Sequence, residues 1–164
     1  MAESPPFRAT PGWALAASLA VAVAAVAASP PLVGFEGGAL VFAAFEPFCH
    51  QLAARSPHAA GVPFALCHRC FGVAAGLAAG VLAGPLAPRL LARVAARHPL
   101  AVLGVAAVPA GLDWVLGVAG VWANTGASRL ATGALFGVAA GMMLAVAFCR
   151  IPAVTPYQTP PNHA

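Results

Sequence analysis

Long apolar runs separated by short polar breaks occupy most of the chain between residues 13 and 148. A helix needs about 20 apolar residues to cross a hydrocarbon core of ~30 Å. Runs of roughly this length predict four membrane-spanning helices, over residues 13–33, 71–88, 99–121 and 130–148. We therefore expect an all-α fold, namely a polytopic membrane protein built as a four-helix transmembrane bundle.

The first apolar run ends at Pro30 and Pro31 and has a competing interpretation. A secretory signal peptide also joins a basic residue, here Arg8, to an apolar segment and a small-residue cleavage site, which residues 27–29 resemble. The run is longer than the ~7–15 apolar residues usual in signal peptides, and proline follows it directly. We therefore favour a first membrane span that stays in the protein over a signal peptide that is removed.

A shorter apolar segment, residues 35–48, lies between the first two spans and carries Glu36 and Glu46. Its length and its phenylalanines at every third position predict a short outer helix that is interfacial or re-entrant. A polar loop rich in cysteine and histidine follows it. The membrane domain then covers residues 13–149.

Composition narrows the class of protein, since 61% of the residues are hydrophobic and only 7% are charged. Soluble domains carry about a quarter charged residues, so this chain has too few charges for a water-facing surface. The eight basic residues are all arginines and are spread thinly, unlike the basic stripe that binds nucleic-acid phosphates. We expect the lipid bilayer as a partner and no nucleic acid.

Three arginines crowd the predicted loop between the second and third spans, at Arg89, Arg93 and Arg97. The positive-inside bias places such a loop in the cytoplasm. We expect the protein in the inner (plasma) membrane of the cell. With four spans, both tails, residues 1–12 and 150–164, then lie in the cytoplasm. The C-terminal tail is rich in proline and is expected to be disordered.

Glycine recurs every four residues in the second and fourth predicted spans. Small residues at this spacing give a helix a smooth face on which another helix packs closely. Such contacts form within a chain or between copies, so a homo-oligomer through these faces is a candidate assembly. The glycines are Gly72, Gly76, Gly80 and Gly84, followed by Gly133, Gly137 and Gly141.

Three cysteines and a histidine crowd the predicted outer loop and the start of the second span. Cys67 and Cys70 have the CxxC spacing of half a structural zinc site, and Cys49 with His50 supplies further ligands for a tetrahedral site. Zinc binding by Cys49, His50, Cys67 and Cys70 is the leading interpretation. This topology places the site on the outer face.

The same CxxC pair also suits thiol redox chemistry, because free N–H groups and the dipole at a helix N-terminus lower a thiol pKa. In this second interpretation Cys67 and Cys70 are the active pair and a lipid quinone is the electron acceptor. The architecture is similar to that of quinone-linked disulfide-forming proteins and relatives of vitamin K epoxide reductase. A metal transporter and a non-enzymatic membrane protein with structural thiols are also compatible with these residues.

One carboxylate, Asp113, lies inside the third predicted span, where an ionised side chain costs about 2.5–3.5 kcal/mol on insertion scales. Arg129, at the start of the fourth span, is its expected partner, with Asn124 as a bridge. This group clamps two helices or serves the site as ligand, proton carrier or general base. If the protein is a metal-dependent enzyme, Asp113, Asn124 and Arg129 are its candidate catalytic residues.

These residues resemble the signature of the domain-of-unknown-function 2085 family of small prokaryotic membrane proteins. The first family motif is CHQ, then RS, then PLCxRCxG, and the second combines D, N, R and TG. The matching residues here are Cys49, His50, Gln51, Arg55, Ser56, Cys67, Arg69, Cys70, Gly72, Asp113, Asn124, Arg129, Thr132 and Gly133.

The resemblance covers residues 49–141 and shows two departures from the family pattern. Phe64 and Ala65 replace the residues expected before Leu66, and His68 stands where a small residue is usual. The resemblance implies a multi-spanning membrane protein with these signature residues. It implies no established reaction.

Overall fold

The structure is a computed structural model that describes residues 10–149, and it is built mainly from helices. The predicted all-α membrane fold is confirmed. The predicted C-terminal tail and residues 1–9 of the predicted N-terminal tail lie outside the described residues. The helices are α1 (Pro11–Ala27), α2 (Gly34–Phe45), α3 (His68–Ala83), α4 (Arg89–Arg97), α5 (Pro99–Val118) and α6 (Gly126–Phe148).

Short elements connect the helices around the loop that carries the cysteines. A two-stranded antiparallel hairpin pairs β1 (His58–Ala59) with β2 (Val62–Pro63). Its turn residues Ala60 and Gly61 both have left-handed backbone, with φ of 49° and 80°, as tight hairpin turns require. Three single 3-10 turns complete the described elements: η1 (Pro30–Leu32), η2 (Ala53–Arg55) and η3 (Gly84–Leu86).

Three segments in the described part of the chain are long and apolar enough to cross a membrane: His68–Leu86, Pro99–Val118 and Gly126–Phe148. The helices α1 and α2 are apolar but shorter. The predicted number of four spans therefore stays a prediction.

The other spans begin or end within a few residues of their predicted limits, and two larger differences from the prediction have a local cause. The first helix ends at Ala27 instead of residue 33, because Pro30 and Pro31 lack the N–H that would continue it. Residues 89–97 form helix α4 instead of a loop. Its leucines and arginines recur at helical spacing, which gives the helix one apolar and one basic face.

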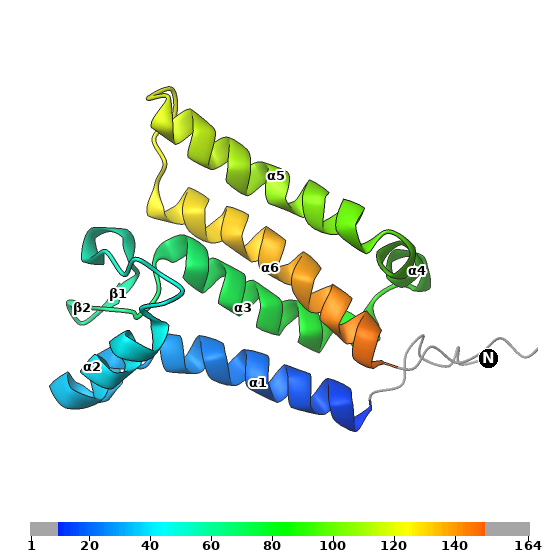
Figure 1. Ribbon diagram of the computed structural model, residues 1–164, viewed down its shortest axis with the longest axis horizontal. Helices are drawn as coiled ribbons and strands as arrows, with labels where there is room; N and C mark the ends of the chain where they lie inside the picture. Colours follow the sequence, from blue (N-terminus) through cyan, green and yellow to red (C-terminus); the bar gives the residue numbers. More distant parts are fainter. Residues whose placement is uncertain (1–9, 150–164) are drawn as a thin grey trace, which may run out of the picture.

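Figure 1 shows α1, α3, α6 and α5 lying side by side in that order. α3 and α6 run in the same direction, while α1 and α5 run the opposite way. We call the end that carries α2, the hairpin and the start of α3 the cysteine end. We call the other end, which carries α4, the arginine end.

α3 and α6 form the closest helix pair, because glycines on each helix face the backbone of the other. A Cβ added to Gly76 would lie closer than 3.0 Å to backbone atoms of Ala134, and one added to Gly137 would do so to Leu77. The predicted use of the glycines in close packing is confirmed within one chain. The same packing buries these faces, so they are not free for a second copy.

The loop between α2 and α3 is folded against the ends of α1 and α2. The Ala65 amide donates to the carbonyl of Ala27 at 2.9 Å, and both alanines are fully buried. The Gln51 side-chain amide donates to the carbonyl of Phe42 at 2.7 Å. These bonds fix the loop and hold Cys49 beside the start of α3.

Candidate metal centre

Three of the four cysteines converge at the cysteine end although two of them are far from the third in sequence. The sulfur atoms of Cys49, Cys67 and Cys70 all lie within 4.8 Å of one another. Cys49 and Cys67 are buried, and Cys70 is half-buried. The loop after α2 supplies Cys49, and the start of α3 supplies the other two.

Local backbone geometry explains why the three sulfurs meet. Cys67 is the N-cap residue of α3, and its amide donates to the Cys49 sulfur at 3.3 Å. Cys70 follows three residues later, so its side chain lies on the same side of the helix start. A hydrogen bond from the Cys70 thiol lowers the pKa of the Cys67 thiol, which favours its thiolate form.

The spacing of the sulfurs suits a tetrahedral zinc ion. Zinc–sulfur bonds of ~2.3 Å with tetrahedral angles place the sulfurs roughly 3.8 Å apart. The cluster would need to contract by no more than about 1 Å to reach this spacing. Three thiolates would then supply three of the four ligands that zinc takes.

His50, the fourth predicted ligand, lies outside this group of three sulfurs. Its side chain is exposed, and its Nδ1 atom accepts a hydrogen bond from the Leu52 amide at 3.3 Å. The remaining nitrogen, Nε2, is the atom available for a metal. His50 borders the same cavity as Cys67 and Cys70, so its role as a ligand stays a prediction.

The imidazole ring of His68 contacts both the cysteine loop and the start of α6. Its Nδ1 atom donates to the Arg55 carbonyl at 2.7 Å. Its ring also covers Gly126, where an added Cβ would lie closer than 3.0 Å to the ring. His68 therefore joins the cysteine loop to the start of α6.

A polar network beside the cysteines joins α3, α5 and α6. Arg69 donates to Asp113 Oδ2 at 2.5 Å, and the Asn124 amide donates to the same oxygen at 2.7 Å. Arg129 donates through Nε to the side-chain oxygen of Asn124. The predicted bridge through Asn124 is therefore present, and Arg129 reaches Asp113 only through it.

Arg69 is the direct partner of Asp113, and the prediction from sequence missed it. The sequence does hold one indication of this pairing. Arg69 lies between Cys67 and Cys70, which places it at the same end of the bundle as Asp113. Gly133 has no side chain, so α6 can lie directly against the backbone of α3 at Arg69. This close packing brings the Arg69 side chain within reach of Asp113. The carboxylate is buried, with 5% of the side chain exposed.

Cys67 and Cys70 share a cavity of about 530 Å³ with the polar network. Cys49 and Asp113 adjoin this cavity through their contacts with the residues that line it. All seven residues predicted for the site therefore lie at the cysteine end. The cavity is lined by His50, Arg55, Cys67, Arg69, Cys70, Trp114, Gly117, Val118, Asn124 and Arg129.

The fourth cysteine, Cys149, lies at the arginine end. It is buried against Ala87 and Ala92 and belongs to a separate apolar cluster. Burial raises the pKa of its thiol. Cys149 is therefore separate from the three clustered cysteines.

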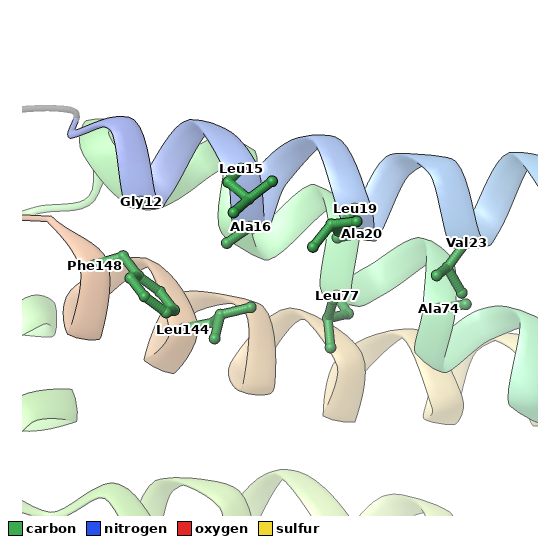
Figure 2. A pocket seen from close by; sticks show the side chains of 10 residues that line it. All are labelled: Gly12, Leu15, Ala16, Leu19, Ala20, Val23, Ala74, Leu77, Leu144 and Phe148. Atoms are coloured by element: carbon green, nitrogen blue, oxygen red, sulfur yellow. The ribbon is translucent and has the colours of Figure 1, made fainter.

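A second cavity lies between α1, α3 and α6 and is almost wholly apolar. Figure 2 shows leucine, valine and phenylalanine side chains from these helices around it. Its volume is about 480 Å³, and its lining residues include Leu15, Leu19, Leu77 and Phe148. No lining residue carries an ionisable side chain, so the polar cavity is the site of interest.

The segment that carries the polar cavity also matches a known protein family. A family model described as "Predicted membrane protein (DUF2085)" matches residues 49–143. The matched segment contains the three clustered cysteines, the polar network and the close α3–α6 pair. No curated protein and no solved structure matches the chain.

Proposed function

The chain belongs to the DUF2085 family of predicted membrane proteins, and we propose that it binds a zinc ion through Cys49, Cys67 and Cys70. The observation that carries the proposal is the convergence of three thiols within 4.8 Å from two separate segments. The N–H bond to the Cys49 sulfur adds support, because such bonds stabilise thiolate ligands.

The fourth zinc ligand comes from the polar cavity under this proposal. His50 Nε2 would complete a closed structural site, whereas a water molecule would make the site catalytic. Zinc supplies Lewis-acid chemistry and lowers the pKa of a bound water to about 7. The cavity, which gives a substrate access to the metal, favours a metal-dependent membrane enzyme.

The polar network has two roles in such an enzyme. Asn124 and Arg129 border the cavity and would contact the substrate. Asp113 holds Asn124 in place through Oδ2, while its other oxygen, Oδ1, has no hydrogen-bond partner among the described residues. Oδ1 is buried and Asp113 does not line the cavity, so a proton would reach Oδ1, the oxygen proposed as general base, through a water molecule.

The proposed topology places this site on the outer side of the plasma membrane. The arginine end exposes Arg93 and Arg97 on α4, and positive loops favour the cytoplasm. The opposite direction of α1 and α3 fits a chain in which α1 is a fourth span. Both tails are then cytoplasmic. A reporter enzyme that is active only in the cytoplasm, fused after residue 164, should be active.

Metal analysis of the full chain purified in detergent tests the proposal. We expect one zinc per chain, falling to less than about a tenth in Cys49→Ser, Cys67→Ser and Cys70→Ser because each variant removes one thiolate ligand. Cys149→Ser is the matched control, since it changes a buried cysteine at the other end, and it should keep its zinc. A metal-free protein with a reducible Cys67–Cys70 bond would contradict the proposal.

A second candidate function is supported by the proximity of the two thiols of the CxxC pair, whose sulfur atoms lie within 4.8 Å of each other. A Cys67 thiolate beside a Cys70 thiol is the reduced form of a redox-active pair. Oxidation would form the Cys67–Cys70 bond and release two electrons and the Cys70 proton; these, with one further proton from water, would reduce a lipid quinone to the quinol. Thiol counting with and without a reductant separates the two functions, because only the redox protein gains two thiols on reduction.

A further inference from the structure

Positive side chains outnumber negative ones around the polar cavity. Arg55, Arg69 and Arg129 border it, and Asp113 is the carboxylate of the adjoining network. Arg69 lies 2.5 Å from that carboxylate and neutralises it. Arg129 contacts only the neutral side chain of Asn124 in the network. Its charge therefore has no carboxylate of its own among the described residues.

A half-buried cation in an apolar protein is costly unless an anion lies near it. The metal centre does not remove the imbalance. Three thiolates around one zinc ion carry a single negative charge, so the positive groups still exceed the negative groups by one. An anionic ligand in the cavity would complete the balance.

The geometry of Arg129 indicates which anion fits. Its Nε atom is held by Asn124, which fixes the guanidinium plane while its two terminal nitrogens make no hydrogen bond within residues 10–149. A fixed guanidinium recognises the paired oxygens of carboxylate and phosphate groups. Arg55 is exposed at the border of the same cavity and adds a second positive charge.

The other walls indicate the rest of the ligand. Trp114 and Val118 of α5 line the cavity and are exposed, with 57% and 71% of their surfaces accessible. The volume of about 530 Å³ lies in the range of small-molecule sites. A ligand that joins an anionic group to an apolar part would contact both kinds of wall.

We propose that this cavity binds the phosphate or carboxylate group of an organic anion, held by Arg129 and Arg55 beside the cysteine cluster. The role of this anion as the substrate rests on the proposed function, in which a zinc ion lies beside the cavity. The phosphate group has two sources, a membrane lipid or a soluble phosphate.

Calorimetric titration of the full chain in neutral detergent tests this inference with two probes, inorganic phosphate and a short-chain phosphatidylglycerol. We expect saturable binding of at least one probe, and the probe that binds identifies the source. Arg129→Gln should weaken binding at least about tenfold, because it removes a charge-assisted pair of hydrogen bonds. Arg55→Gln should weaken it about threefold, as an exposed charge contributes less.

Arg93→Gln is the matched control, because it removes an exposed arginine at the arginine end and should leave binding unchanged. Absence of binding by both probes would overturn the inference, and so would equal binding by the wild type, Arg129→Gln and Arg55→Gln. The Arg55 side chain makes no hydrogen bond within the described residues, so Arg55→Gln remains informative if Arg129→Gln fails to fold.

Zinc content measured on the same samples separates this inference from the proposed function. Zinc that persists in Arg129→Gln while anion binding is lost supports the anion site alone. Zinc-free wild-type protein that binds phosphate contradicts the zinc proposal and leaves the anion site standing.

Discussion

The two ends of the helix bundle share α3 and α6 but differ in what their buried cysteines contact. At the cysteine end, Cys49 and Cys67 lie within 4.8 Å of each other and of Cys70. At the arginine end, Cys149 packs against Ala87 and Ala92. A buried cysteine is therefore a candidate ligand only where separate segments bring several thiols together.

The arginines of the two ends differ in the same way. Arg93 and Arg97 of α4 are exposed, and their placement reflects the surface of the membrane. Arg69 and Arg129 are half-buried and belong to a network with Asp113 and Asn124. Charge at the cysteine end therefore joins helices, and under our proposal it also binds an anion.

The largest effect is expected from Asp113→Ala, which breaks the ion pair with Arg69. The change leaves a partly buried guanidinium whose Nε atom already lacks a partner, so we expect a loss of about 3 kcal/mol in unfolding free energy. Unfolding of the protein in mixed detergent and dodecyl sulfate micelles measures it. Arg97→Ala at the arginine end should change stability by less than about 0.5 kcal/mol. Equal losses in both variants would erase the contrast between the two ends.

Gly137→Ala tests whether both ends depend on the same helix pair. The added Cβ would lie closer than 3.0 Å to the backbone of Leu77, so α3 and α6 must separate, at a cost of about 2 kcal/mol. Gly104→Ala on α5 is the control, because an added Cβ there meets nothing within 4 Å. It should be neutral or slightly stabilising, since alanine favours helix. A stable Gly137→Ala variant would show that the close packing is not required.

A smaller effect concerns the ionisation of single thiols in metal-free, reduced protein. The Cys70 hydrogen bond lowers the pKa of Cys67, so its thiolate should persist as the pH falls below the usual thiol range. Burial raises the pKa of Cys149, which should stay protonated at the same pH. Thiolate absorbance near 240 nm at neutral pH should therefore fall in Cys67→Ser and remain in Cys149→Ser. The reverse pattern would contradict the assignment.

Much of the fold follows from the sequence because its strongest signals are local. Apolar runs predict the long helices, and glycines at every fourth position predict the close packing of α3 on α6. Helix α1 ends before its apolar run does, because Pro30 and Pro31 interrupt the helix. Helix α4 was missed because three arginines in nine residues resemble a loop unless their helical spacing is considered.

The clustering of the three cysteines could be predicted from the sequence, whereas the contacts of the neighbouring polar residues could not. The spacing of Cys67 and Cys70 indicates a shared site, and Cys49 joins it as predicted. The pairing of Asp113 with Arg69 depends on how α3 and α5 pack on either side of α6, which no local pattern records. The orientation of His50 likewise depends on loop backbone, where its bond with the Leu52 amide forms.

X-ray absorption at the zinc edge of the purified full chain tests the central claim most directly. The account predicts three sulfur ligands at ~2.3 Å and one nitrogen or oxygen ligand at ~2.0 Å. Cys149→Ser should leave this spectrum unchanged. A zinc shell without sulfur, or a protein that contains no zinc and holds Cys67 and Cys70 in a disulfide, would contradict it.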